Sequence, residues 1–478
     1  METPGYKKST IVTLLLAGAF ISILNQTLMI TAIPPIMEEM KITANSAQWL
    51  TTVFMLVNGI MIPVSAFLLE RFTTRQLFIT AMSIFAFGTL VAGLAPNFGM
   101  LLLGRVIQSS GAGVMLPLMQ TVFLMIFPVN KRGAAMGLIG LVISFAPAIG
   151  PALSGWITAN YSWRLLFFII LPIALIDILI AVFALKNVTD VTKPKVDVFS
   201  IILSSFGFGG LLYGFTSAGN YGWLDTVTLL SLGIGMLALV LFITRQLRLK
   251  HPMLEFRVFQ YSIFPLTVLV GMIVFMGLIG VETLIPLFMQ NMRDFTAFEA
   301  GLALLPGALI TGFMSPVTGR IFDKVGVKWL AITGLLFITA SSFAFTNLGP
   351  STSFTFITIM YGVRMFGLSM VMMPIATAGL NQLPKRLIPH GAAMDNTMRM
   401  IAASVGTAIL VTVMTTTAET AQQRPEISYP DIHGANVAFI VVSILSLAGL
   451  IISFFIKNNK LPEEEVVEKR DGKVCVNE

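Results

Sequence analysis

The sequence predicts an all-α integral membrane protein with fourteen transmembrane helices, and three observations lead to this prediction. Hydrophobic residues make up 56% of the 478 residues and charged residues only 11%, whereas roughly 25% of the residues of an average soluble protein are charged. The mean hydropathy of +0.87 is an average over the whole chain, so the apolar excess is not confined to one anchor. Apolar stretches of the roughly 20 residues that a bilayer-crossing helix needs recur along the entire length.

The apolar stretches follow one another through short connections. In chain order they cover residues 10–33, 47–69, 75–95, 98–125, 132–158, 164–185, 199–219, 227–247, 263–290, 297–318, 326–348, 353–378, 389–416 and 434–457. A β-barrel is excluded, because barrel strands alternate apolar and polar residues in runs of about ten. The first stretch is too long for a cleaved signal peptide, and no small-residue cleavage site follows it.

The distribution of basic residues predicts how the helices are oriented. If the N-terminus is cytoplasmic, 23 of the 30 Lys and Arg residues fall in cytoplasmic segments. Only four then fall in the outer segments, namely Lys41, Arg164, Arg293 and Arg424. Cytoplasmic loops of membrane proteins carry such an excess of Lys and Arg. We therefore expect both termini in the cytoplasm.

Composition and spacing also exclude several function classes. The net charge of +7 comes from short, regularly spaced basic clusters, which does not favour nucleic-acid binding. The single cysteine, Cys475, excludes a disulfide framework. His251, His390 and His433 lie on three separate predicted loops, so we expect neither a metal site nor an enzyme. The chain contains no phosphate-binding loop of the G-x-x-x-x-G-K-[ST] type, which argues against ATP as the energy source.

The chain contains an internal repeat, supported by three matches. Residues 131–136 (KRGAAM) match 389–394 (PHGAAM) at an offset of 258, and 114–117 (VMLP) match 371–374 (VMMP) at 257. The loop at 66–75 matches the loop at 319–328 at an offset of 253. The first six helices therefore recur as the last six, in the same orientation. Parallel repeats of six helices are typical of alternating-access transporters, which bind substrate between the two halves.

The repeat predicts four regions. Residues 1–190 form an N-terminal six-helix bundle and 259–457 a C-terminal one, while 191–258 form a two-helix insert and 458–478 a cytoplasmic polar tail. Because the insert has no repeat partner, we expect it to pack outside both bundles and to leave the central cavity alone.

Several segments resemble a known family. The loop at 319–328 (GRIFDKVGVK) resembles the G-x-L-a-D-r-x-G-r-k signature of the major facilitator superfamily, and 66–75 is a degraded copy. Residues 103–111 (LGRVIQSSG) resemble its membrane-embedded arginine motif. Residues 137–155, rich in glycine and proline, resemble its antiporter motif and run into 162–172 (SWRLLFFIILP). With fourteen helices, this pattern is similar to the drug:proton antiporters of Gram-positive bacteria, including lincomycin-type and multidrug exporters.

The resemblance implies the major facilitator fold and proton-coupled efflux of amphipathic drugs or toxic compounds. It implies a proton gradient as energy source, no cofactor, and a bacterial plasma membrane location. Expected partners are small amphipathic or cationic substrates, protons and the lipid bilayer, with no nucleic acid, and we expect a monomer. Two alternatives stay open: a specific exporter of one antibiotic, bile component or signalling metabolite, and a non-transporting membrane sensor on the same fold.

One departure from the family pattern concerns proton coupling. The first helix of the family commonly carries an acidic residue in an L-D-x-T pattern, whereas this chain has Asn25, within residues 24–27 (LNQT). An asparagine cannot release a proton, so the coupling carboxylate must lie elsewhere. We expect Glu282 to hold the proton, with Asp177 as a second candidate. Ionisable residues inside a membrane indicate function by default.

The depth of Glu282 predicts its surroundings. At 1.5 Å per residue, Glu282, Arg105 and Asn25 lie roughly 10–14 Å below the outer surface. Since the first and fourth helices of each half line the cavity in this fold, we expect Glu282, Asn25, Arg105 and Arg364 to share one cavity. The structural alternative for Glu282 is a partner for Arg105 or a backbone break near Pro286. The full set of predicted cavity residues is Asn25, Gln26, Asn58, Arg105, Gln108 and Arg364.

The two matched loops predict a gate on the cytoplasmic side. Asp323 can reach the N-terminus of the helix at 132–158, and Glu70 that of the helix at 389–416, where each meets the partial positive charge of a helix end. Asp395 and Arg399 are four residues apart, which favours an internal ion pair near this gate. The predicted gating residues are Glu70, Arg71, Arg75, Gly150, Pro151, Gly319, Asp323, Lys324, Gly326, Lys328, Asp395 and Arg399.

Overall fold

The computed structural model describes residues 7–189, 191–192 and 194–456. Within this part of the chain, 14 helices are long and apolar enough to cross a membrane, which confirms the predicted number. Lys193 and the polar tail with Cys475 lie outside the described residues.

The helices follow one another in the predicted order. Their bounds are α1 Lys8–Met40, α2 Ala44–Arg71, α3 Thr74–Gly93, α4 Phe98–Ile126, α5 Arg132–Asn160, α6 Arg164–Ala184, α7 Val198–Tyr221, α8 Thr226–Arg248, α9 Ile263–Met292, α10 Ala297–Val325, α11 Val327–Ala344, α12 Phe354–Leu380, α13 Ile388–Gln422 and α14 Pro430–Ser453. Several are longer than their apolar stretches. α1 continues through Pro34 and Pro35 to Met40, and α13 continues to Gln422, so both extend past the apolar segment.

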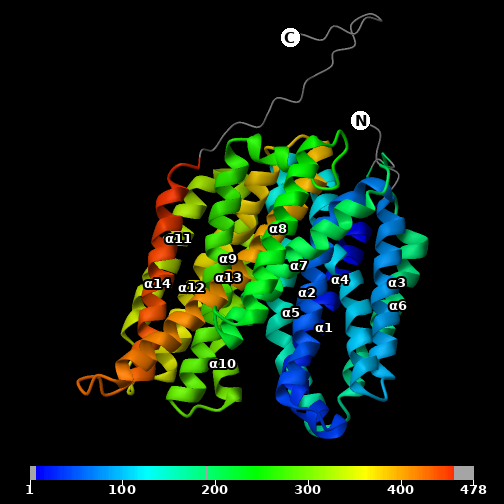
Figure 1. Ribbon diagram of the computed structural model, residues 1–478. Helices are drawn as coiled ribbons and strands as arrows, with labels where there is room; N and C mark the ends of the chain where they lie inside the picture. The colour runs from blue at the N-terminus through cyan, green and yellow to red at the C-terminus, as the bar shows by residue number, and fades with distance from the viewer. Residues whose placement is uncertain (1–6, 190, 193, 457–478) are drawn as a thin grey trace, which may run out of the picture.

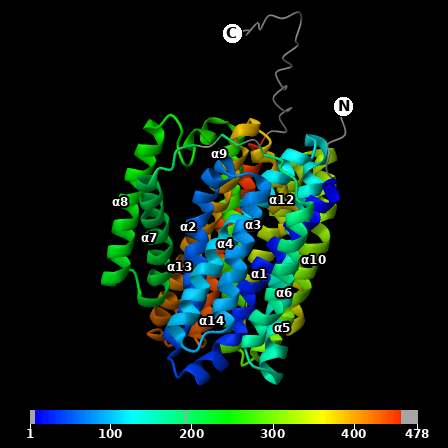
Figure 2. The same cartoon turned by 90° about the vertical axis from the view of Figure 1, so that its right-hand side faces the viewer.

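The helices run alongside one another, and α1 begins at the same face of the molecule at which α14 ends (Figure 1). We call this the terminal face and the other the distal face. Helices α1–α4 and α6 pack mainly within the first half, and α9 and α11–α14 mainly within the second, whereas α5 and α10 each pack most extensively on the other. Figure 2 shows α7 and α8 at one side of the molecule, where α7 packs on α2 and α13, and α8 packs mainly on α7.

Local sequence explains where several helices begin and end. The Thr73 side chain accepts from the Gln76 amide, and Gln76 reaches back to the Thr73 amide, forming a capping box at the start of α3. Thr296 and Glu299 form the same arrangement at the start of α10. Gly326 separates α10 from α11 with a φ of 84°. That left-handed conformation favours glycine, which explains the glycine in the 319–328 loop.

The two halves meet along α5 and α10, which form the most extensive helix contact between them. A Cβ on Gly133 would collide with the backbone carbonyl of Gly319, and one on Gly319 would collide with that of Gly133. The absence of side chains at both positions therefore lets the two helices touch near the terminal face.

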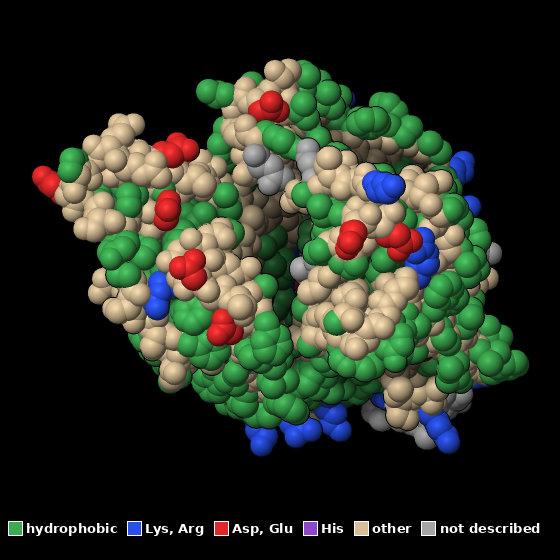
Figure 3. All heavy atoms as spheres, turned by 90° about the horizontal axis from the view of Figure 1, so that it is seen from below, with side chains coloured by type: hydrophobic (Ala, Val, Ile, Leu, Met, Phe, Trp, Pro, Cys, Tyr) green, Lys and Arg blue, Asp and Glu red, His purple; other side chains and the backbone are tan. Residues whose placement is uncertain are grey.

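Towards the distal face, α5 and α10 turn to their own halves. There α5 packs on α1, where a Cβ on Gly150 would collide with Thr27, and α10 packs on α12, where Gly307 faces Tyr361. Figure 3 shows the distal face hollowed by a cleft between the two halves. The halves are thus joined at the terminal face and separated at the distal face.

Candidate functional site

The first interhalf contact at the terminal face joins Asp323 of α10 to the first turn of α5. The Asp323 carboxylate accepts from the backbone amides of Gly133 at 2.7 Å and Ala134 at 2.9 Å. These amides have no partner within the helix, and the helix end carries a partial positive charge. The structure therefore contains the contact that the 319–328 loop predicts.

The second contact joins Glu70, at the end of α2, to the first turn of α13. Its partner is a side chain: Nε2 of His390 lies 2.9 Å from Oε1 of Glu70. Nδ1 of the same ring accepts from the backbone amide of Glu255 at 3.3 Å. Glu70 therefore lies at the N-terminal turn of α13, where the group that it meets is an imidazole and not a free backbone amide.

Two further hydrogen bonds connect the halves near the same face. Arg132 of α5 donates to Oδ1 of Asn381 at 2.8 Å. Asn396 of α13 donates to Oε1 of Gln120 on α4 at 2.6 Å, and both side chains are buried. Sequence reasoning missed all four residues together with His390. The repeat could have indicated His390, because the matched segments align it with Arg132.

Glu282 lies on α9 in the C-terminal half, where it is half-buried. The Tyr361 hydroxyl of α12 donates to its carboxylate at 3.3 Å. The guanidinium of Arg364, one turn further along α12, lies close enough to act on the charge of Glu282. Arg364 also donates to the hydroxyl of Ser342 on α11. The structure thus brings Glu282 and Arg364 together, and adds Tyr361, which sequence reasoning missed.

Arg105 forms a separate cluster inside the N-terminal half. Its guanidinium is fully buried and donates to Asn25 Oδ1 at 2.6 Å and to Gln108 Oε1 at 2.7 Å. It also donates to the Leu50 carbonyl at 3.2 Å and lies 4.2 Å from the ring centroid of Phe54. Asn25 stands at the position where the L-D-x-T pattern has an aspartate, and here its amide oxygen accepts from Arg105.

The expectation of one shared cavity for Glu282, Asn25, Arg105 and Arg364 is not met in this conformation. Asn25 and Arg105 are enclosed by α1, α2 and α4, whereas Glu282 and Arg364 are held between α9, α11 and α12. The alternative in which Glu282 pairs with Arg105 is also not observed among the described ion pairs and hydrogen bonds. Counting residues along a helix estimates the depth of a side chain, but depth does not specify which side of the helix faces the centre.

The remaining predicted residues inside the membrane lie in helix contacts. Asp177 is 5% exposed on α6, and a Cβ on Gly18 of α1 would lie 3.2 Å from its Oδ2, so it sits between helices of one half. Asp395 and Arg399 form the predicted ion pair at 3.1 Å, with both side chains buried. Asn58 packs against α4 at Gly113.

The loop residues predicted to gate have varied partners. Arg71 donates to the Pro194 carbonyl at 2.7 Å, which attaches the end of α2 to the linker before α7. Arg75 donates to the carbonyl of Val182, which attaches the start of α3 to the last turn of α6. Lys324 lies at the end of α10 and Lys328 at the start of α11, on either side of Gly326. Pro151, next to Gly150, lies inside α5, where its carbonyl accepts from Thr31 at 3.5 Å. Gln26 adjoins Asn25 on α1 and is half-buried.

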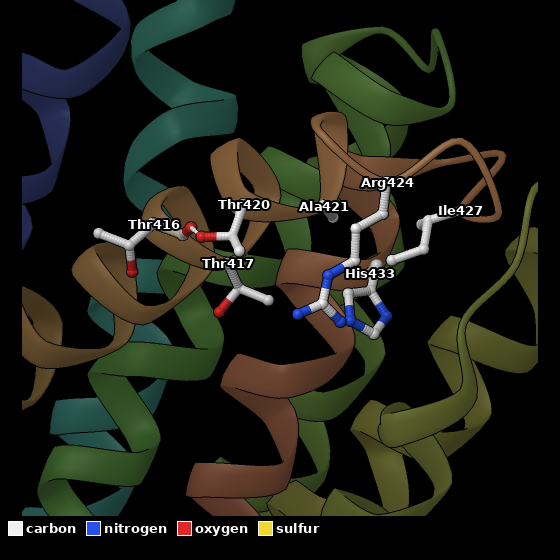
Figure 4. Close-up of a pocket in the computed structure, with 7 residues that line it drawn as sticks. All are labelled: Thr416, Thr417, Thr420, Ala421, Arg424, Ile427 and His433. Atoms are coloured by element: carbon white, nitrogen blue, oxygen red, sulfur yellow. Dashed lines mark hydrogen bonds between the residues drawn. The ribbon is translucent and has the colours of Figure 1, made fainter.

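Two pockets lie away from these clusters. One, of about 250 Å³, lies where α13 meets the loop before α14; Figure 4 shows Arg424 and His433 pointing towards each other beside the threonines of α13. The other, of about 700 Å³, has an almost wholly apolar lining from α10, α11 and α12 that includes Phe313, Phe337 and Phe366. None of the residues predicted for proton coupling, the substrate cavity or gating lines either pocket.

At the distal face, Glu39 ties the end of α1 to the start of α6. The carboxylate accepts hydrogen bonds from the Arg164 guanidinium and from Trp163 Nε1 at 2.7 Å. The hydrogen bond from Arg164 holds the pKa of Glu39 below its ordinary value. Because all three residues belong to the N-terminal half, this contact does not connect the two halves.

Comparison with known proteins agrees with this architecture. Residues 15–407 match the model of the Major Facilitator Superfamily. The chain is 56% identical over 465 residues to YcnB, an MFS-type transporter of Bacillus subtilis, covering 97% of this chain and 98% of the relative. It is 43% identical to the lincomycin resistance protein LmrB of the same organism, covering 95% and 97%.

Structural comparison supports the same fold. The human organic anion transporter MFSD10 superposes with a TM-score of 0.69 over 94% of this chain and 100% of that one, at 14% sequence identity. With fourteen apolar helices, two halves joined at one face and a family match over most of its length, this chain is a multi-pass membrane transporter that belongs to the major facilitator superfamily.

Proposed function

We propose that the chain exports amphipathic small molecules from the bacterial cytoplasm in exchange for protons, by alternating access. The terminal face is the cytoplasmic face in this proposal, in agreement with the bias of Lys and Arg. The closed terminal face and the cleft at the distal face then correspond to an outward-facing state. The chain acts as a monomer in the plasma membrane, with residues 1–190 and 259–457 as its moving halves and 191–258 as an insert, and it uses no cofactor.

The observation that carries the proposal is the environment of Glu282. This carboxylate lies within a membrane helix, between the Tyr361 hydroxyl and the Arg364 guanidinium. A carboxylate in such a place can exchange a proton, and Arg364 can stabilise the charged form that remains after the proton leaves. In this proposal Arg364 is therefore the cation that tunes the affinity of Glu282 for its proton. A bound cationic or polar substrate would compete with the proton for the same carboxylate.

The test is efflux from proteoliposomes under an imposed pH gradient, with lincomycin and an amphipathic cation as probes. We expect Glu282→Gln to abolish the response to the gradient while retaining some substrate binding, because glutamine keeps the shape of the side chain but cannot release a proton. Asp177→Asn is the matched control, since it also neutralises a buried carboxyl, and we expect it to do less damage. If Glu282→Gln responds like wild type and Asp177→Asn does not, the proton travels through α6 instead.

A narrower substrate range is the second candidate. The 43% identity to a protein named for lincomycin resistance favours export of one antibiotic class. Susceptibility profiling of a strain that lacks its own pumps, with and without this gene, separates the two. Resistance to many unrelated amphipaths supports broad export, and resistance to lincomycin alone supports the narrow one.

A further inference from the structure

The first turn of α13 places one imidazole between three parts of the molecule. His390 is 3% exposed. Its Nε2 faces Glu70 of the N-terminal half, and its Nδ1 faces the backbone amide of Glu255 in the linker between α8 and α9. The same side chain therefore touches both the opposite half and the segment that leads out of the insert.

The hydrogen bonds define the protonation state in this structure. Because the Glu255 amide donates to Nδ1, that nitrogen carries no proton, and the proton of a neutral ring lies on Nε2, where it is donated to Glu70. A second proton can only enter at Nδ1. It would convert the contact with Glu70 into an ion pair and would place two donors opposite each other at Glu255.

Three elements next to this ring in the sequence or in contact with it carry charged residues. They are Glu70 and Arg71 on α2, Glu255 and Arg257 on the linker, and Lys385 and Arg386 on the turn before α13. Arg71 donates to the Pro194 carbonyl, and Arg257 lies 3.6 Å from the Glu255 carboxylate. Glu70 is thus the carboxylate that the structure places in direct contact with the ring.

We propose that His390 makes closure of the cytoplasmic face respond to cytoplasmic pH. Protonation of the ring strengthens the contact between the two halves and releases the linker of the insert. Acidification of the cytoplasm therefore holds the cytoplasmic gate shut and limits further proton entry. Histidine suits this role because it changes charge between about pH 5 and 8. The inference rests on the alternating-access function proposed above.

The experiment measures the gate directly, with the full chain in lipid nanodiscs and without substrate or gradient. Replacing Cys475 by Ser removes the only cysteine of the chain. Phe72→Cys and Pro384→Cys then place spin labels on two exposed positions, one in each half beside the contact. Pulsed electron paramagnetic resonance gives the closed and open populations at about pH 8 and about pH 5.5, which bracket the range in which histidine changes charge.

We expect the ratio of closed to open molecules to rise about fivefold on acidification in the otherwise unmodified chain, as for a hydrogen bond that gains a charged donor. His390→Gln can still donate to Glu70 but cannot gain a charge, so its ratio should not rise in this way. Glu70→Gln removes the anion and should lose the same response. Asp323→Asn, at the other contact, should lower the closed population at both pH values and keep the response.

An equal rise in His390→Gln and in the unmodified labelled chain overturns the inference, and so does opening of the gate at low pH. If His390→Gln fails to fold, as judged by thermal unfolding, the response of Glu70→Gln decides. Because no gradient or transport is involved, a failure of proton-driven efflux would refute the proposed function without affecting this result.

Discussion

The two interhalf contacts at the terminal face occupy matching places in the repeat, yet they differ in chemistry. At the start of α5, Asp323 accepts from two backbone amides. At the start of α13, Glu70 meets the side chain of His390 instead. The first contact depends on the backbone amides of the helix end, which are present whatever the side chains, provided that the carboxylate can approach them closely. The second depends on one particular side chain, so a single substitution at that position removes it.

The insert accounts for part of this difference. The Thr192 amide donates to the Glu70 carbonyl at 3.0 Å, and Glu255 contacts His390. Both linkers of the insert therefore reach the second contact, whereas the Asp323 contact is made by α5 and α10 alone. A repeat can thus keep its topology while an insertion adds contacts to one of its two matching sites.

The largest effect is expected from the glycines that permit each contact. A Cβ on Gly133 would meet the backbone of Gly319, which cannot move without separating α5 from α10. A Cβ on Gly391, the matching residue of α13, would meet the flexible side chain of Leu383. We expect Gly133→Ala to destabilise the closed state by about 2–3 kcal/mol and Gly391→Ala to destabilise it by less than about 1 kcal/mol. Thermal unfolding and the closed population measure both, and equal effects would contradict the comparison.

An intermediate effect is expected from the two acids. Asp323→Asn removes a negative charge at a helix N-terminus and one of the two oxygens that accept from the backbone amides. The closed state should therefore lose about 1–2 kcal/mol relative to the open state. Glu70→Gln loses a charge opposite a neutral ring, so the loss should be about 0.5–1 kcal/mol. The double variant should show the sum, because the two contacts share no residue. Spin-label distances across the terminal face give the closed population of each variant and so test this ranking. A larger loss in Glu70→Gln than in Asp323→Asn would contradict it.

The smallest effect is expected at the distal face, where Glu39 joins α1 to α6 within one half. The pKa of Glu39 is lower in the folded protein than its ordinary value near 4.5. The charged carboxylate therefore contributes to folding stability above about pH 4.5, and this contribution disappears as the pH falls through the lower pKa of the folded protein. Glu39→Gln should therefore lower the melting temperature slightly at neutral pH, and this difference should shrink as the pH falls below about 4.5. The populations of the terminal gate should not change, and a change in them would show that this contact also affects gating.

Composition, periodicity and charge were enough to predict the number of helices and their order, because a membrane requires each crossing segment to be long and apolar. The repeat was enough to predict that Asp323 and Glu70 lie at helix N-termini, since matched loops at equivalent places in the topology meet equivalent helix ends. These features depend on local sequence or on symmetry, and a single sequence contains both.

Side-chain partners inside the bundles depended on the tertiary structure. The depth of a residue follows from counting along a helix, but its direction depends on how that helix is rotated against its neighbours. For this reason the pairs Asn25–Arg105 and Glu282–Arg364, which were expected to share one cavity, lie apart in two separate clusters, and the contact of Glu282 with Tyr361 was not foreseen. The same limit applies to His390, whose contact with Glu70 joins residues 320 positions apart in the sequence. Only the packing of the two halves brings that pair together.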